Sequence, residues 1–159
     1  MKKNKILYLV IFVIVVQVAG LIGSIFTGQS VDSWYQTLIK PEFNPPSWVF
    51  GPVWTILYLM MAVAAFFVWQ KGLNKKAVKC ALLVFVIQLA LNVLWSFLFF
   101  GLQNPFFAFI ELIILWIAIL LTIIKFYKVS KPAAWLLIPY ILWVSFAAIL
   151  NFAIWQLNM

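Results

Sequence analysis

Residues 6–26 read ILYLVIFVIVVQVAGLIGSIF, an unbroken apolar stretch that follows Lys2, Lys3 and Lys5. A helix that crosses the hydrocarbon core of a bilayer needs about 20 apolar residues, and this stretch meets that length. The apolar core of a secretory signal is shorter, about 7–15 residues, and it ends at a small-x-small cleavage site. Because this stretch is longer and lacks a clean site of that kind, we predict a first transmembrane helix rather than a cleaved leader.

Four further apolar stretches follow the first and are separated by short connections. Hydrophobic residues make up 67% of the 159-residue chain and charged residues 9%, too little polar surface to cover a water-soluble globule. The sequence predicts an all-α membrane protein, one domain over residues 1–159 that forms a single bundle of five transmembrane helices. A proline inside the last stretch, Pro139, predicts a kink there. The predicted spans are residues 6–26, 47–70, 77–100, 105–127 and 133–156.

The charges are distributed very unevenly along the chain. Eleven lysines face three acidic residues, there is no arginine, and the formal net charge is +8. Five spans place the N-terminus, the second connection and the fourth connection on one side of the membrane, and Lys40 is then the only lysine on the other side. The positive-inside rule predicts an N-terminus inside and a C-terminus outside, and it explains the basic charge without a nucleic-acid partner. The lysines of the inner side are Lys2, Lys3, Lys5, Lys71, Lys75, Lys76, Lys79, Lys125, Lys128 and Lys131.

The residue types that carry most enzyme chemistry are scarce. The chain has no histidine and a single cysteine, Cys80, so it lacks the commonest general base and the usual metal ligands. No carboxylate pair shares a span, and no glycine-rich phosphate loop is present. The sequence therefore predicts no metal site and no required cofactor, and a ligand-binding protein fits it better than a hydrolase or a phosphotransferase.

Polar residues inside the spans are candidate functional groups, because burial in lipid makes them costly. Gln88, Asn92 and Ser96 recur every four residues and share one face of the third span. This stripe suits either hydrogen bonding between helices or the wall of a cavity, and periodicity leaves both open. Glu111 is the only acid within any span.

Nine tryptophans exceed what the aromatic belts at the two membrane surfaces require. Four of them, Trp54, Trp95, Trp116 and Trp143, lie well inside predicted spans, where an indole N–H needs a partner. Either a flat aromatic ligand held between rings or ordinary core packing would explain them. The other five lie near span ends: Trp34, Trp48, Trp69, Trp135 and Trp155.

The first connection carries the most specific motif of the chain. Residues 34–58 read WYQTLIKPEFNPPSWVFGPVWTILY, which resembles the signature of the TspO/MBR family, also called translocator protein, tryptophan-rich sensory protein or peripheral benzodiazepine receptor. The similarity resumes at residues 88–95 and 99–101 of the third span, and at 139–143 and 150–152 of the fifth. It covers nearly the whole chain and points to a bacterial-type member.

The resemblance implies a five-helix bundle, commonly a homodimer, with a pocket that opens toward the first connection and binds porphyrins and benzodiazepine-like ligands. Some bacterial members degrade protoporphyrin IX in light and oxygen, and the resemblance places that photochemistry at Trp54 and Trp143. It implies a multi-pass protein of the bacterial cytoplasmic membrane. Carried over by motif, the ligand-binding residues are Trp34, Tyr35, Pro45, Trp54, Tyr58, Asn92, Trp95, Trp143, Ala147 and Leu150.

The expected function is tetrapyrrole binding in the membrane, in a sensor, a scavenger or a light-dependent degrader. A transporter of porphyrin or of other lipophilic molecules is the main alternative, and a non-catalytic structural membrane partner is another. Animal members bind cholesterol through a segment with a tyrosine and a basic residue near the end of the fifth helix. Residues 150–156 contain neither, so cholesterol is not an expected ligand of that segment.

Overall fold

The structure, a computed structural model, describes residues 2–159, which are almost entirely helical. Five helical segments are long and apolar enough to cross a membrane, as predicted, and they run over Asn4–Ser30, Ser47–Trp69, Lys76–Gly101, Pro105–Val129 and Lys131–Leu157. The α-helices are α1 (Lys2–Ser30), α2 (Trp34–Thr37), α3 (Phe50–Trp69), α4 (Lys76–Ser96), α5 (Pro105–Val129), α6 (Lys131–Leu136) and α7 (Ile138–Leu157). A 3-10 turn at Ser47–Val49 leads into α3, and a π-helical turn at Phe97–Gly101 closes α4.

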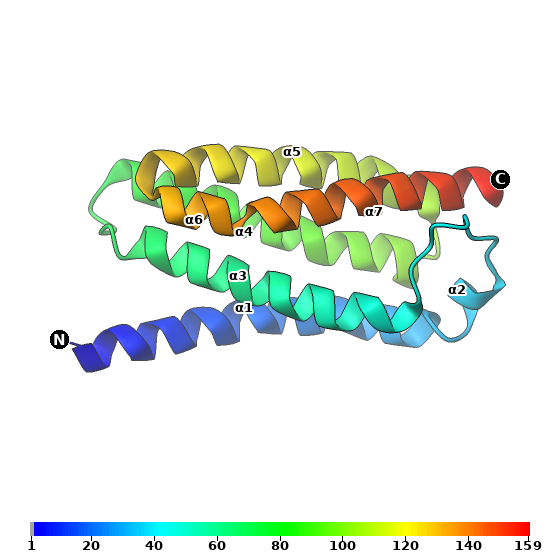
Figure 1. The fold of residues 1–159 in the computed structure, drawn as a ribbon, viewed down its shortest axis with the longest axis horizontal. Coiled ribbons are helices and arrows are strands. Elements are labelled where there is room, and N and C mark those ends of the chain that lie inside the picture. The colour runs from blue at the N-terminus through cyan, green and yellow to red at the C-terminus, as the bar shows by residue number, and fades with distance from the viewer. Residues whose placement is uncertain (1) are drawn as a thin grey trace.

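The helices form one elongated bundle in which sequential spans run in opposite directions (Figure 1). The pairs α1 with α3, α4 with α5, and α5 with α7 make the most extensive contacts. The short helix α2 and the rest of the first connection cover one end of the bundle, where the C-terminus also lies. The N-terminus and the α3–α4 turn lie at the other end.

Local sequence explains where the spans begin and break. Pro105 occupies the first turn of α5, and the Asn104 side chain accepts a hydrogen bond of 3.0 Å from the Phe107 N–H. The fifth span is divided at Leu137, just before Pro139, because proline cannot donate a backbone hydrogen bond. The helix thus breaks two residues before Pro139, the position of the predicted kink, and the break separates α6 from α7.

Small residues let α1, α3 and α4 approach closely. Ala62, Ala64, Ala65 and Ala81 are fully buried in the core. At Gly20 an added Cβ would lie 2.8 Å from the Tyr58 ring, so only glycine allows the ring to lie there. This contact fixes the spacing of α1 and α3 at mid-bundle.

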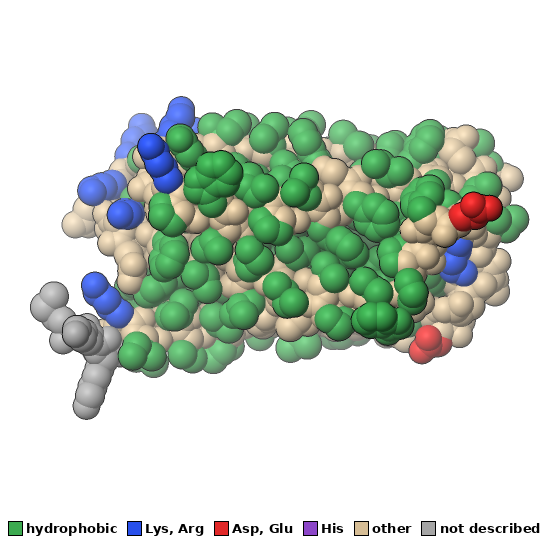
Figure 2. All heavy atoms as spheres, in the orientation of Figure 1, with side chains coloured by type: hydrophobic (Ala, Val, Ile, Leu, Met, Phe, Trp, Pro, Cys, Tyr) green, Lys and Arg blue, Asp and Glu red, His purple; other side chains and the backbone are tan. Residues whose placement is uncertain are grey.

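Charged side chains gather at opposite ends of the bundle (Figure 2). Lysines cluster at the end that holds the N-terminus, whereas the exposed acidic side chains lie at the end that holds α2. Lys40, in the first connection, is the one lysine of that second end, as the five-span arrangement requires. The structure thus brings the lysines of three separate segments together.

This asymmetry predicts the orientation in the membrane. A reporter enzyme fused after Met159 should be active only outside the cytoplasm, and one inserted at residues 72–74 only inside, because positively charged segments are retained in the cytoplasm. Activity measured in whole cells checks both fusions. The reverse pattern would show that the lysine cluster does not set the topology.

Glu111 is an unusual core residue. It lies in α5 with 5% of its surface exposed, and neither carboxylate oxygen has a hydrogen-bond partner among the described residues. A buried polar group without a partner costs about 1–3 kcal/mol of stability.

Replacing the Glu111 side chain with an apolar one of similar length should therefore stabilise the bundle. We expect Glu111→Met to raise the free energy of unfolding by about 1–3 kcal/mol, read as a higher thermal midpoint in detergent. Glu42→Met, at an exposed position, is the control and should change little. A lower midpoint for Glu111→Met would mean that the carboxyl makes an interaction on which the bundle depends.

Candidate functional site

A cavity of about 340 Å³ lies in the half of the bundle that α2 covers, remote from the lysine cluster. Volumes of about 300–1,000 Å³ are typical of small-molecule sites. Helices α1, α3, α4 and α7 form its walls, and α2 contributes one side chain at its end. The lining comprises Gln17, Gly20, Leu21, Gly23, Ser24, Thr27, Val31, Tyr35, Ser47, Phe50, Gly51, Trp54, Thr55, Tyr58, Asn92, Trp95, Ser96, Phe99, Phe100, Trp143, Ala147, Leu150, Asn151 and Ile154.

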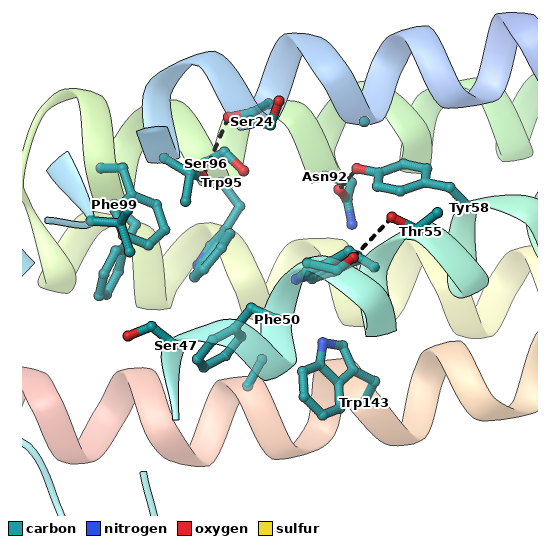
Figure 3. A pocket seen from close by; sticks show the side chains of 18 of the residues that line it. Ser24, Ser47, Phe50, Thr55, Tyr58, Asn92, Trp95, Ser96, Phe99 and Trp143 are labelled. Carbon is teal, nitrogen blue, oxygen red and sulfur yellow. Dashed lines mark hydrogen bonds between the residues drawn. The ribbon is translucent and has the colours of Figure 1, made fainter. Parts of the chain in front are cut away.

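Aromatic rings from three helices dominate the cavity wall (Figure 3). The Trp54 ring lies 5.8 Å from the Tyr58 ring between centroids, and both belong to α3. Trp143 of α7 packs edge-to-face on Phe50 of α3 at 6.0 Å. Trp95 of α4 stacks on Phe99 at 5.2 Å. Rings presented from several directions suit a flat apolar ligand.

A chain of side-chain hydrogen bonds closes the deep end of the cavity. The Tyr58 hydroxyl donates to Asn92 Oδ1, and Asn92 Nδ2 donates to the Tyr140 hydroxyl at 2.9 Å. The Tyr140 hydroxyl in turn donates to Gln88 Oε1 at 2.9 Å. We refer to these four residues as the tyrosine–amide chain. Asn92 therefore fits both interpretations of the polar stripe, because it forms hydrogen bonds between helices and also lines the cavity.

The intramembrane indoles differ in whether their N–H groups have partners. Trp95 Nε1 donates to Asn151 Oδ1 at 3.1 Å, and Trp116 Nε1 donates to Ser145 Oγ at 2.8 Å. Trp143 Nε1 is buried and has no partner among the described residues. In Figure 3 the Trp143 nitrogen lies on the side of the ring that faces α3.

The first connection supplies Tyr35 to the end of the cavity. The Tyr35 side chain is buried, its hydroxyl donates to Asn44 Oδ1 at 2.8 Å, and Lys40 Nζ lies 4.9 Å from the ring centroid. Burial raises the pKa of the Tyr35 hydroxyl, and the Asn44 hydrogen bond opposes part of that rise. The hydroxyl is therefore a neutral hydrogen-bonding group at physiological pH.

The structure brings most of the predicted ligand-binding residues to this one cavity. Two of them do not line it: Trp34 packs its ring against Phe99 at 5.6 Å, and Pro45 lies in the loop beyond Tyr35. That the lining residues hold a ligand stays a prediction. The predicted residues that line the cavity are Tyr35, Trp54, Tyr58, Asn92, Trp95, Trp143, Ala147 and Leu150.

Sequence reasoning missed the contribution of α1. Gly20 and Ser24 line the cavity, together with Gln17 and Thr27, and none of the four is among the predicted ligand-binding residues. Their small or polar character at helical spacing was the available signal, but the same spacing serves ordinary helix packing. On α7, Asn151 also lines the cavity, and its role as the partner of Trp95 emerged from the structure.

One side of the cavity is exposed between α1 and α3. Leu21 is 63% exposed, and Ser24, Gly51 and Thr55 are also exposed. The hydroxyls on this side bond to their own helices, Ser24 Oγ to the Leu21 carbonyl at 2.7 Å and Thr55 Oγ1 to the Gly51 carbonyl at 2.9 Å. The opening therefore presents mainly apolar surface toward the region that the bilayer would occupy.

Comparison with known proteins reveals close similarity over nearly the whole chain. The sequence model of the TspO/MBR family matches residues 12–156. The chain is 50% identical to the tryptophan-rich protein TspO of Chlorobaculum tepidum over 87% of this chain and 88% of that one. It is 48% identical to the protein of the same name from Archaeoglobus fulgidus, over 96% and 98% of the two chains. Similarity to the translocator protein of Homo sapiens is 39% identity over 86% and 82%.

The tyrosine–amide chain predicts that Asn92 contributes to stability as well as to the cavity wall. We expect Asn92→Ala to lower the free energy of unfolding by about 1–3 kcal/mol, because the Tyr58 hydroxyl loses its acceptor and the Tyr140 hydroxyl keeps only its bond to Gln88. Thermal unfolding in detergent measures the loss. Ser96→Ala, one turn further along the same wall, is the matched control. Equal midpoints for the two variants would show that the hydrogen bonds of Asn92 contribute little to stability.

Proposed function

The chain belongs to the TspO/MBR family of membrane proteins, and from that membership we propose that its cavity binds a planar tetrapyrrole such as protoporphyrin IX. The single observation that carries the proposal is the set of indoles from three helices, Trp54, Trp95 and Trp143, around one apolar cavity. A tetrapyrrole offers a broad π-face to such rings, and stacking of this kind contributes about 0.5–1.5 kcal/mol beyond simple burial.

The polar groups of the cavity also favour this ligand class. The Trp143 ring lines the cavity, and its buried N–H has no partner among the described residues. At the end covered by α2, Lys40 is the only lysine, and its ammonium lies over the Tyr35 ring that lines the cavity. The carboxylates of a protoporphyrin directed toward this end would find a cation there, while the ring enters the apolar part.

We further propose that light and oxygen drive the degradation of the bound porphyrin, with Trp54 and Trp143 flanking the ring. The chain has no histidine, and acid–base catalysis is not needed when the ligand itself absorbs the light. Indole gives up an electron far more readily than a phenyl ring. The part of Trp54 and Trp143 in this chemistry is therefore to stack on the ligand and to supply an oxidisable group beside it.

Transport is the second candidate, and the exposed side between α1 and α3 favours it. A lipophilic ligand could pass between the cavity and the bilayer through that opening without crossing a polar surface. The proposal includes a homodimer in a bacterial cytoplasmic membrane, no required cofactor, and benzodiazepine-like molecules as further ligands of the same cavity. A non-catalytic structural partner in the membrane would bind no porphyrin at all.

Titration with protoporphyrin IX, first in darkness and then in light, tests the proposal. We expect saturable binding in the dark and loss of porphyrin absorbance on illumination in oxygen. Porphyrin that crosses sealed vesicles without loss of absorbance would favour the transporter instead. Absence of saturable porphyrin binding would contradict both the degradation and the transport proposals and would favour a structural role in the membrane.

Phenylalanine variants separate binding from photochemistry. Trp54→Phe and Trp143→Phe should each weaken binding only modestly, by less than about tenfold, because a ring remains for stacking. Light-dependent loss of absorbance should be abolished in both. Trp135→Phe is the control, since Trp135 is 65% exposed and lies outside the cavity. Bleaching at the unmodified rate in both cavity variants would show that the indoles act only as passive walls.

A further inference from the structure

A second hollow, of about 520 Å³, lies at the lysine end of the bundle, far from the cavity described above. It forms where the start of α1 meets the end of α3 and the turn that follows. We refer to it as the lysine-end hollow. Its lining residues are Asn4, Lys5, Tyr8, Trp69, Gln70, Lys71, Gly72 and Leu73.

Packed aromatic rings form the base of the lysine-end hollow. The Tyr8 ring of α1 lies 4.5 Å from the Trp69 ring of α3 between centroids. Phe66 stacks on Trp69 at 5.9 Å, and Phe12 packs against both of these rings at 5.9 to 6.0 Å. Tyrosine and tryptophan at the end of a span mark the level of the lipid headgroups. The hollow therefore lies at headgroup depth rather than in bulk water.

The turn after α3 holds the backbone at Lys71 in a defined place. The Lys71 N–H donates to the Val68 carbonyl at 3.1 Å, and the Gly72 N–H donates to the Trp69 carbonyl at 3.0 Å. Gly72 has a φ of 99°, a left-handed conformation that favours glycine, and it turns the chain back toward α4. Lys71 thus lies two residues after Trp69, whose ring forms the base of the hollow.

The charge of the hollow has no counterpart in the protein. Lys5 and Lys71 line it, and no lining residue is acidic. The chain has only three acids: Asp32 and Glu42 lie in the first connection at the opposite end, and Glu111 lies in the core. The amides of Asn4 and Gln70 and the hydroxyl of Tyr8 add hydrogen-bond donors. Two cations and several donors around one hollow suit an oxyanion.

We propose that the lysine-end hollow binds the phosphodiester headgroup of an anionic phospholipid. Lys5 and Lys71 pair with the phosphodiester, and the amides bind hydroxyl groups of the headgroup. Ile11 and Val15 lie one and two turns further along α1 from Tyr8 and are exposed, so they offer an apolar path for an acyl chain. The same chemistry could come from a soluble phosphate, but that ion would make no use of the apolar path or of the aromatic base.

Native mass spectrometry of the full chain in detergent, with added phosphatidylglycerol or phosphatidylcholine, tests the proposal. We expect a bound phosphatidylglycerol that phosphatidylcholine does not replace. The double variant Lys5→Gln with Lys71→Gln should lose about tenfold in affinity for phosphatidylglycerol, since two lysines near the headgroup are removed. The single variant Lys71→Gln, at an exposed turn position, should also lower the affinity for phosphatidylglycerol. It provides the test if the double variant folds poorly.

A matched control distinguishes a built site from general attraction to a basic surface. Lys76→Gln with Lys128→Gln removes two exposed lysines from the same end but none from the hollow. This pair should retain phosphatidylglycerol nearly as well as the unmodified protein. Equal losses in the two pairs would overturn the proposal in favour of diffuse charge. Displacement of the lipid by inorganic phosphate at the same concentration would overturn it in favour of a soluble anion.

Discussion

The tyrosine–amide chain, which runs through Tyr58, Asn92, Tyr140 and Gln88, joins α3, α4 and α7 where these helices meet at mid-bundle. In a bilayer each helix makes its own backbone hydrogen bonds. Because lipid tails are as apolar as the side chains, the hydrophobic effect gives little preference for one packing of the helices over another. A buried amide with two specific partners does give such a preference. The tyrosine–amide chain therefore fixes the relative rotation of three helices, and the cavity lies on the side of it that faces α2.

The contact between Gly20 and Tyr58 extends this arrangement to α1. Because the Tyr58 ring fills the place where a larger residue of α1 would lie, α1 is held close at that level. Beyond it, toward α2, small residues on both helices leave the cavity wall thin and exposed between Ser24 and Gly51. Tyr58 thus forms the inner end of the cavity, donates a hydrogen bond to Asn92 and determines how closely α1 approaches α3. A site made of rigid, hydrogen-bonded elements positions its rings more accurately than loops would.

The two ends of the molecule carry different groups. The end covered by α2 holds the cavity, the exposed acids and Lys40, whereas the other end holds the lysine cluster and the aromatic base of the lysine-end hollow. Lysines retained in the cytoplasm would place the cavity nearer the outer leaflet and the hollow at the inner headgroups. A lipophilic ligand and an anionic lipid would then meet the protein at opposite leaflets, without competition for the same surface.

Hydrophobic stretches of spanning length, separated by short connections, were sufficient to predict five membrane helices, because lipid allows few alternatives to a helix. The clustering of lysines at one end also followed from the order of the spans. The family motifs identified eight of the residues that line the cavity, three of them between Trp34 and Tyr58. The part played by α1, the absence of Trp34 and Pro45 from the lining and the unpartnered Trp143 N–H emerged only from the tertiary structure. Periodicity places a side chain on a face of its helix, but which helix that face meets depends on rotation and depth. Those are set by contacts between distant residues, such as Asn92 with Tyr140 and Gly20 with Tyr58.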